Sequence, residues 1–549
     1  MPMSASPVVR PITSAPHSGH GRRTSAPTRI AAIDIGSNSI RQIVADVSPD
    51  GTIHVVDEMK AAPRLAAGLD SSGELSDEAI RRAILALDHM ATLARQLSAD
   101  RIEVVATSAV REASNAAFFL ARVQQETGLR IRVLDGEEEA RLGFRSAVAH
   151  FELGVGRAAV VDIGGGSLEL ALSADGIIER LVSLPLGAVR LTERYLADGT
   201  TPRGIRKLRS AVRDALRRAV SVRDWRGAHV IGSGGTFTNL AGIVLTRQGM
   251  TAARNVHGAC VQRGELEHVL YMLSEMTLEE RRSVPGLNAG RADIIVAGLA
   301  VAAELMARID ARELRVSRYG IREGILLETA RVTPVVSDPG ESRERSLRDF
   351  AERCHVEWGH AQTVRQLALR LFDALGARLG CDPSDRITLA DAALVHDVGY
   401  HINYDRHHKH SYHLVVHAEL LGMSPVEQVV VANVARYHRG EPPKQKHRNF
   451  GTLDKTLRRR IRRLSAILRI ADGLDRGHVG AVGDVKVRWL RRAIRITPVP
   501  SDPRHTLRLE LWGAHRKSGL LAKLAGVPVE IVAPDKTVLS SNAVRRIGD

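Results

Sequence analysis

Two short segments of similar sequence constrain the fold of this chain more than any other feature. They are AAIDIGSNSI, residues 31–40, and AAVVDIGGGSLELAL, residues 158–172. Each reads as a buried strand that ends in Asp-Ile-Gly and continues into small or hydroxyl residues. Each turn therefore sets a carboxylate, Asp34 or Asp162, beside unobstructed backbone N–H groups. One such turn is typical of an ordinary β-hairpin, but two predict a duplicated fold that grips a phosphate chain from two sides.

The composition indicates a multidomain protein with an anionic partner. A chain of 549 residues is too long for a single hydrophobic core. Lys and Arg outnumber Asp and Glu by 78 to 62, a net charge of +16. This excess favours polyphosphate, a nucleotide, nucleic acid or a membrane surface as partner, although Arg used for solubility would give the same excess. Aromatic residues make up only 3%, which disfavours single-stranded nucleic acid.

The cysteines and the apolar runs indicate a cytoplasmic protein. Cys260, Cys354 and Cys381 form no CxxC pair, so we expect reduced thiols and no disulfide framework. We find no apolar run near the roughly 20 residues that a membrane-spanning helix needs, and therefore expect no membrane association.

The order of apolar and turn-forming segments predicts an α/β core followed by a helical and then a β-rich region. Strand-turn-strand hairpins precede alternating helices and strands, and residues 76–98 have helical spacing with Ser76 as N-cap. TLRLELWG, residues 506–513, alternates like a strand. The predicted regions are a disordered tail (1–28), two α/β subdomains (29–150 and 151–330), a linker (331–345), a helical domain (346–480) and a β-rich domain (481–549).

Three glycine turns supply the candidate phosphate-binding groups. The third, residues 231–242, opens a predicted helix whose N-terminus favours an anion. Asp34 and Asp162 cannot bind phosphate oxygens themselves, so we expect them, with Glu169, to hold Mg²⁺ or Mn²⁺ or to position water. The predicted phosphate-binding residues of the turns are Gly36, Ser37, Asn38, Ser39, Gly164, Gly165, Gly166, Ser167, Gly234, Gly235 and Thr236.

With these turns in place, residues 29–330 resemble the Ppx/GppA family of exopolyphosphatases and guanosine pentaphosphate phosphohydrolases. The resemblance implies a duplicated actin/Hsp70/sugar-kinase-like, ribonuclease H-like core. Hsp70 and sugar kinases share the Asp-x-Gly turns but lack the SNS, ATSAVRE and GEEEAR segments. The matching segments are DIGSNS, RLAAGLDSSGELS, ATSAVREASN, DGEEEARLG, DIGGGSLEL, LPLGAVRLTE, GSGGTFTNLA and PGLNAGRADIIVAG.

The resemblance also implies roles for individual residues. The family's general base falls on Glu139, although the run Glu137–Glu139 also reads as the charged first turn of a helix. Arg111 would clamp a phosphate. Weaker candidates are Arg64, Arg190 and Arg291, the last oriented by Asp293.

The helical region contains His396-Asp397, the dipeptide that names the HD superfamily. Together with His360 and Asp472 it forms a mixed imidazole and carboxylate set suited to Mn, Fe, Zn or Mg. Long exopolyphosphatases often carry an HD-like domain as a non-metal scaffold, whereas this sequence retains the pair. We expect His410 and His438 to serve a second metal, and assign the remaining histidines of this region to a basic or solvated loop and the helix after it: His407, His408, His413 and His417.

These features predict a cytoplasmic, homodimeric exopolyphosphatase that releases terminal orthophosphate processively from polyphosphate with Mg²⁺. The alternative is guanosine pentaphosphate (pppGpp) 5′-phosphohydrolase, with the same chemistry on a nucleotide. Two other classes are an actin-like or sugar-kinase-like ATP-dependent protein and a non-catalytic polyphosphate- or RNA-binding regulator. The retained acidic residues of the turns argue against the regulator.

Overall fold

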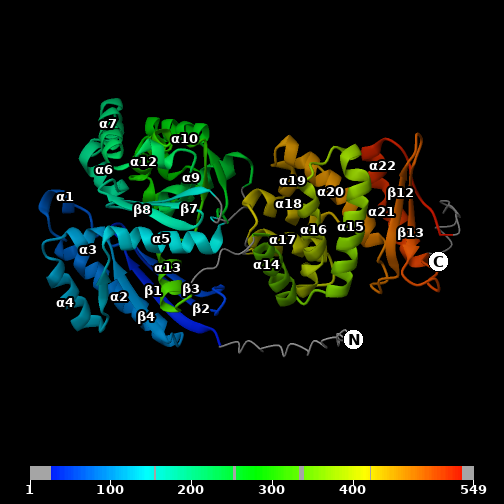
Figure 1. Cartoon of the computed structure of the whole chain (residues 1–549), viewed down its shortest axis with the longest axis horizontal. Coiled ribbons are helices and arrows are strands. Elements are labelled where there is room, and N and C mark those ends of the chain that lie inside the picture. The colour runs from blue at the N-terminus through cyan, green and yellow to red at the C-terminus, as the bar shows by residue number, and fades with distance from the viewer. Residues whose placement is uncertain are drawn as a thin grey trace, which may run out of the picture.

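The computed structural model describes residues 26–151, 153, 156–250, 255–332, 339–418, 420 and 422–534. Figure 1 shows two α/β halves stacked on one another, with a helical region beside them and a small sheet at the far end. The predicted disordered tail lies almost entirely outside the described residues.

Two sheets of the same topology form the α/β halves. The first has the order β3-β2-β1-β4-β5, and the second contains β8-β7-β6-β9-β11, with β10 added at its edge. In both, the first three strands are antiparallel and the last two run parallel to the central strand. This repeat confirms the predicted duplicated actin-like, ribonuclease H-like core. The strands are β1 (Thr28–Ile35), β2 (Ile40–Val47), β3 (Ile53–Ala61), β4 (Arg101–Ala106), β5 (Ile131–Val133), β6 (Arg157–Ile163), β7 (Leu168–Ala174), β8 (Ile177–Leu184), β9 (His229–Ser233), β10 (Cys260–Gln262) and β11 (Glu313–Val316).

Helices cover these sheets and join the two halves. Ser76 caps α2 by accepting the N–H of Ala79, as predicted. Helix α5 contacts strands of the second sheet, and α13 returns from the second half to pack on α5 and β1. The helices are α1 (Leu69–Ser72), α2 (Asp77–Gln96), α3 (Ser108–Glu112), α4 (Ala116–Thr127), α5 (Gly136–His150), α6 (Ala188–Tyr195), α7 (Pro202–Ala219), α8 (Val222–Trp225), α9 (Gly234–Arg247), α10 (Arg263–Glu275), α11 (Leu278–Arg282), η1 (Ala289–Arg291), α12 (Ile295–Arg308) and α13 (Ile321–Thr329).

The rest of the chain is a helical region followed by a three-stranded sheet with two helices. The first helix begins at Pro339, so residues 339–345 of the segment predicted as a linker are helical. None of the described helices is long and apolar enough to cross a bilayer. The elements are α14 (Pro339–Arg353), α15 (Trp358–Leu379), α16 (Asp385–Val395), η2 (Val398–His401), α17 (His407–His417), α18 (Pro425–Arg436), α19 (Arg448–Gly451), α20 (Lys455–Gly473), β12 (Val482–Trp489), β13 (Ile494–Pro500), α21 (Arg508–Lys517), α22 (Gly519–Ala525) and β14 (Val529–Ile531).

The segment TLRLELWG is a helix, contrary to the predicted strand. It forms the start of α21, where Leu507, Glu510, Leu511 and Ala514 are buried and Leu509 is 46% exposed. Burial thus follows the three-to-four residue spacing of a helix rather than the alternation of the letters. The helix packs on α20 so closely that a Cβ on Gly473 would lie 2.8 Å from the backbone of Ala514.

The glycine turns of the two halves meet at van der Waals distance. A Cβ on Gly165 would lie 2.8 Å from the Cβ of Ser37, in the turn of the other half. A Cβ on Gly187, at the start of α6, would lie 2.2 Å from the carbonyl carbon of Gly166. Only glycine permits this approach of backbone to backbone.

Replacing Gly187 with alanine is therefore expected to displace α6 or the Gly164–Gly166 turn. We expect Gly187→Ala to lower the free energy of unfolding by roughly 1–3 kcal/mol, the usual range for an overpacked site. Gly264→Ala in α10 is the matched control, because a Cβ there meets nothing within 4 Å. Thermal unfolding followed by circular dichroism measures both, and an unchanged midpoint for Gly187→Ala would contradict the packing described.

Candidate active site

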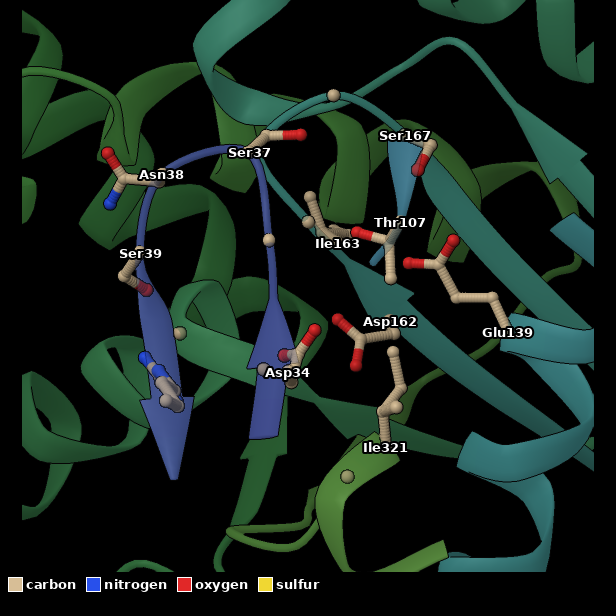
Figure 2. Close-up of a pocket in the computed structure, with 18 of the residues that line it drawn as sticks. Asp34, Ser37, Asn38, Ser39, Thr107, Glu139, Asp162, Ile163, Ser167 and Ile321 are labelled. Atoms are coloured by element: carbon tan, nitrogen blue, oxygen red, sulfur yellow. The ribbon is translucent and has the colours of Figure 1, made fainter. Parts of the chain in front are cut away.

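The cleft between the two α/β halves collects the glycine turns and the aspartate that ends the first strand of each half. Figure 2 shows Asp34 and Asp162 at the ends of their strands, with Glu139 reaching toward them from α5. The cleft is lined by Asp34, Gly36, Ser37, Asn38, Ser39, Arg41, Thr107, Glu139, Asp162, Ile163, Gly164, Gly165, Gly166, Ser167, Gly234, Gly235, Arg291, Arg318, Gly320, Ile321 and Arg322.

The two hairpins place different partners opposite their aspartates. Asp34 on β1 pairs in register with Arg41 on β2, whereas Asp162 on β6 pairs with Glu169 on β7. Residues directly opposite each other share one face of a sheet. The duplicated turns therefore give an acid–base pair in one half and an acid–acid pair in the other.

Four carboxylates lie in or directly behind the cleft, with Glu139 and Glu169 buried and Asp34 and Asp162 partly exposed, and the loss of hydration raises the pKa of each. It raises the pKa of Asp34 to about 6 and that of Glu169 to about 8. Burial also raises the pKa of Asp162, which accepts a hydrogen bond of 2.8 Å from the Ser233 hydroxyl. The pKa of Glu139 is well above its usual range because of burial and the neighbouring Glu169.

Arg111 lies beside Glu139 rather than on the cleft wall. Its Nη1 donates to the carbonyl oxygen of Leu134 at 2.8 Å and lies 3.2 Å from Oε2 of Glu139. This cation lowers the pKa of Glu139 and partly offsets the effect of burial. The geometry thus favours a role for Arg111 in holding Glu139, instead of the predicted phosphate clamp.

Of the three weaker arginine candidates, one lines the cleft and two contact residues around it. The Arg291 side chain lines the cleft and lies against Gly235, where a Cβ would fall 1.9 Å from the guanidinium carbon. Arg190 Nε donates to the carbonyl oxygen of Gly166 at 2.9 Å. Arg64 forms an ion pair with Asp293 at 2.9 Å. Burial lowers the pKa of Arg291 and the Asp293 charge raises it, so the predicted influence of Asp293 on Arg291 stays a prediction.

Two predicted site residues lie behind the cleft. Thr236 is 1% exposed and packs on α12, where a Cβ on Gly298 would lie 2.6 Å from its hydroxyl. Its side chain is therefore directed to the core rather than to a phosphate. Glu169 accepts a hydrogen bond of 3.1 Å from Ser183 and acts on the cleft through its charge on Glu139.

Sequence reasoning missed several polar residues of the cleft: Arg41, Thr107, Arg318 and Arg322. Arg41 carried a usable signal, because it follows Asp34 by the same seven positions by which Glu169 follows Asp162. Arg318 and Arg322 flank the start of α13 and reach the cleft through the tertiary fold.

The oxygen donors of the cleft fit a hard divalent cation. Asp34 Oδ1 is buried and has no hydrogen-bond partner among the described residues. Asp34 and Asp162 are the carboxylates that would hold Mg²⁺ or Mn²⁺, since these ions prefer oxygen ligands.

The helical region brings together five of the six predicted metal ligands. His360, His396, Asp397, His438 and Asp472 are all buried, and their ligand atoms fall into groups that could hold a metal ion.

His410, the sixth predicted ligand, is partly exposed and belongs to none of these groups. Its place is taken by His407, which we had assigned to a solvated loop and which is only 1% exposed. Helix α17 starts at His407, and its buried face continues at Ser411, one turn later. The position at which this helix begins determines which of the two histidines faces the buried side, and the sequence alone did not reveal that position.

Comparison with known proteins identifies the family. The model of the Ppx/GppA phosphatase family matches residues 43–332, more than half of the chain, and that of Ppx/GppA phosphatase domain III matches residues 342–496. This chain belongs to the Ppx/GppA phosphatase family. The sequence resemblance is thereby confirmed, while the HD-like assignment of the helical region stays a prediction.

Similar proteins include both enzyme types of this family. A guanosine-5′-triphosphate,3′-diphosphate pyrophosphatase of Pseudoalteromonas atlantica is 28% identical over 423 residues, 74% of this chain and 79% of that protein. The structure of an exopolyphosphatase-like protein is 29% identical, with a TM-score of 0.52 over 56% of this chain and 99% of that one. An exopolyphosphatase from Cytophaga hutchinsonii shares the fold at 24% identity, with a TM-score of 0.52 over 57% of this chain and all of that one.

Proposed function

We propose that this phosphatase hydrolyses the terminal phosphoanhydride bond of pppGpp and releases orthophosphate. The observation that carries the proposal is the buried Glu139 carboxylate, which reaches into a cleft framed by the two glycine turns (Figure 2). Such a group can take a proton from water while the turns hold the phosphates.

In this mechanism the backbone N–H groups of residues 37–39 and 165–167 bind the phosphate oxygens, since those of Gly36 and Gly164 donate to Ser39 O and Ser167 O within the turns. Glu139 accepts a proton from a water molecule whose oxygen forms a bond to the terminal phosphorus. The bond from that phosphorus to the bridging oxygen breaks, and the shortened chain leaves with the electron pair. Arg41 and Arg291 line the cleft and balance the charge of the phosphates. A divalent cation bound by Asp34 and Asp162 would neutralise further negative charge.

The setting of Glu139 makes its carboxylate a stronger base than an exposed one. Burial raises the pKa of its carboxyl group well above the usual range, and the Arg111 guanidinium lowers it. A base with a pKa near the working pH combines sufficient basicity with a useful deprotonated fraction. Arg111 is thus a positioning and tuning residue in this proposal.

The choice of pppGpp over polyphosphate rests on the curated relative from Pseudoalteromonas, whose name gives that nucleotide. Polyphosphate, favoured by our reading of the sequence, is the second candidate. Its support is the net charge of +16 and the similarity to the exopolyphosphatase-like structure. The cytoplasmic location and the homodimer remain part of the proposal.

Phosphate release from pppGpp, short polyphosphate and long polyphosphate tests this choice. At equal concentrations of terminal phosphate and in excess Mg²⁺, we expect kcat/KM to be highest for pppGpp. ATP is the control for an actin-like or kinase-like protein, and we expect negligible hydrolysis of it. A higher kcat/KM for long polyphosphate would overturn the choice of nucleotide, and no release from any of the three would overturn the proposed reaction.

Removing the cation beside Glu139 should move the pH dependence of the reaction. The base acts when deprotonated, so the rate falls as the pH falls through the pKa of Glu139. Arg111 lowers that pKa, hence Arg111→Met should raise it and shift the acidic limb of the kcat profile to higher pH. Arg132→Met is the control, because Arg132 pairs with Glu138 and Glu328 at the surface. An acidic limb that stays in place, or moves to lower pH, would contradict the coupling.

A further inference from the structure

A second group of buried polar side chains lies in the helical region, and the proposed reaction does not use it. Five segments supply it: α15, the α16–η2 junction, α17, the end of α18 and α20. Each of its members is at most 7% exposed. We call this group the helical cluster; it consists of His360, His396, Asp397, His407, His438 and Asp472.

All four imidazoles of the helical cluster are oriented in the same way. The Nδ1 atom of each faces an acceptor oxygen and therefore carries the hydrogen. The Nε2 atom, on the opposite edge of each ring, is directed to the two aspartates. The Nδ1 contacts are His360 to Asp475 Oδ2 at 2.8 Å, His396 to Ala393 O at 2.8 Å, His407 to Tyr404 O at 3.2 Å and His438 to Ala435 O at 2.6 Å.

This orientation is the one that metal-binding histidines adopt. A hydrogen bond from the far ring nitrogen fixes the tautomer and leaves the Nε2 lone pair for the metal. His360 Nε2 and His396 Nε2 are buried and have no hydrogen-bond partner among the described residues. Two unpartnered, buried lone pairs aimed at carboxylates leave a gap that a cation would fill.

The aspartates divide the four imidazoles into two pairs. Asp397 Oδ2 lies 3.4 Å from His396 Nε2 and 3.7 Å from His360 Nε2. Its other oxygen, Oδ1, lies 3.3 Å from His407 Nε2 and 3.5 Å from His438 Nε2. Asp397 thus stands between two positions, each of which faces two imidazoles.

Asp472 completes both positions in the same manner. Its Oδ1 lies 4.0 Å from His360 Nε2, and its Oδ2 lies 3.9 Å from His438 Nε2. Position one therefore has His360, His396 and one oxygen from each aspartate, and position two has His407, His438 and the other two oxygens. Ligand atoms about 2.1 Å from one ion lie roughly 3.0–3.4 Å apart, close to the shorter of these separations.

Lys517 already places a cation at position two. Its ammonium group, from α21, contacts Asp472 Oδ2. This helix lies beyond residue 496, where the match to family domain III ends. The described ion pairs of Asp397, by contrast, are with the four histidines of the helical cluster. A buried carboxylate with no permanently charged partner is costly, which favours a metal ion at position one.

We propose that the helical cluster binds one divalent transition-metal ion at position one and that Lys517 takes the place of a second ion at position two. The two imidazoles and two carboxylate oxygens of position one favour Mn²⁺, Fe²⁺ or Zn²⁺ over Mg²⁺. The inference is independent of the proposed reaction, because it uses no residue of the phosphatase cleft. It also gives the Lys517–Asp472 contact a purpose, which is to fasten α21 to the helical region in place of a metal bridge.

Mn²⁺ binding to the full-length protein tests the proposal. The protein is stripped with chelator, dialysed against Mn²⁺, and measured for bound manganese and for its electron paramagnetic resonance spectrum. The variant His360→Ala/His396→Ala gives the manganese bound elsewhere, including in the phosphatase cleft. Relative to it, we expect about one further ion in the wild type, with an uncoupled spectrum.

Removing the Lys517 charge should open position two. We expect Lys517→Met to bind about two further ions and to show the spectrum of an exchange-coupled pair. Lys517→Gln should do the same, and it serves as the second variant if Lys517→Met does not fold. In either background, His407→Ala should lose the second ion and the coupling, whereas His410→Ala, on the same helix, should keep both.

Two results would overturn the proposal. Equal amounts of bound manganese in the wild type and in His360→Ala/His396→Ala would show that no ion binds at position one. One further ion with no exchange coupling in both Lys517 variants would contradict the claim that Lys517 replaces an ion at position two. Equal effects of His407→Ala and His410→Ala would contradict it as well.

Discussion

The burial of four carboxylates between the two α/β halves is the constraint on which the rest of the site depends. Glu139 and Glu169 are buried and Asp34 and Asp162 are half-buried, and the loss of hydration is the leading cause that raises the pKa of each. Isolated buried charges are unfavourable, so such a site requires cations or protons. Cations enter the site from both halves, Arg41 and Arg111 from the first and Arg291 and Arg322 from the second, so the halves must close on one another to offset its charge.

That closure is possible because of the glycines. Gly165 meets Ser37 across the cleft, and Gly187 meets the backbone of Gly166. A side chain at Gly165 would push the two halves apart, and one at Gly187 would displace the turn whose N–H groups a phosphate needs. The same residues therefore serve the packing of the fold and the recognition of an anion.

Much of this arrangement could be predicted because it is local or repeated. The two Asp-Ile-Gly turns, the Ser76 cap and the helix that carries Glu139 each follow from a few neighbouring residues. The errors concern properties set by distant packing. Thr236 turns to the core because α12 lies behind it, and TLRLELWG forms a helix that packs closely on α20 at Gly473.

The histidines of α17 and the role of Arg111 are two further features that distant packing determines and that local sequence does not predict. Nothing in the letters around His407 and His410 shows which one faces the buried side of the helix, since that depends on where α17 begins. Arg111 pairs with Glu139, which is 28 residues away in the chain. The motif identifies Arg111 as a functional residue. Whether its side chain faces the cleft depends on how the whole first half folds.

The central claim is that the Glu139 carboxylate is the base, and an isosteric substitution tests it most directly. Glu139→Gln keeps the size of the side chain and removes its basicity, so the account predicts a loss of phosphate release of roughly 10²–10⁴-fold, with substrate binding by calorimetry largely retained. Glu137→Gln, on the exposed side of the same helical turn, should act like the wild type. Wild-type turnover by Glu139→Gln would contradict the account.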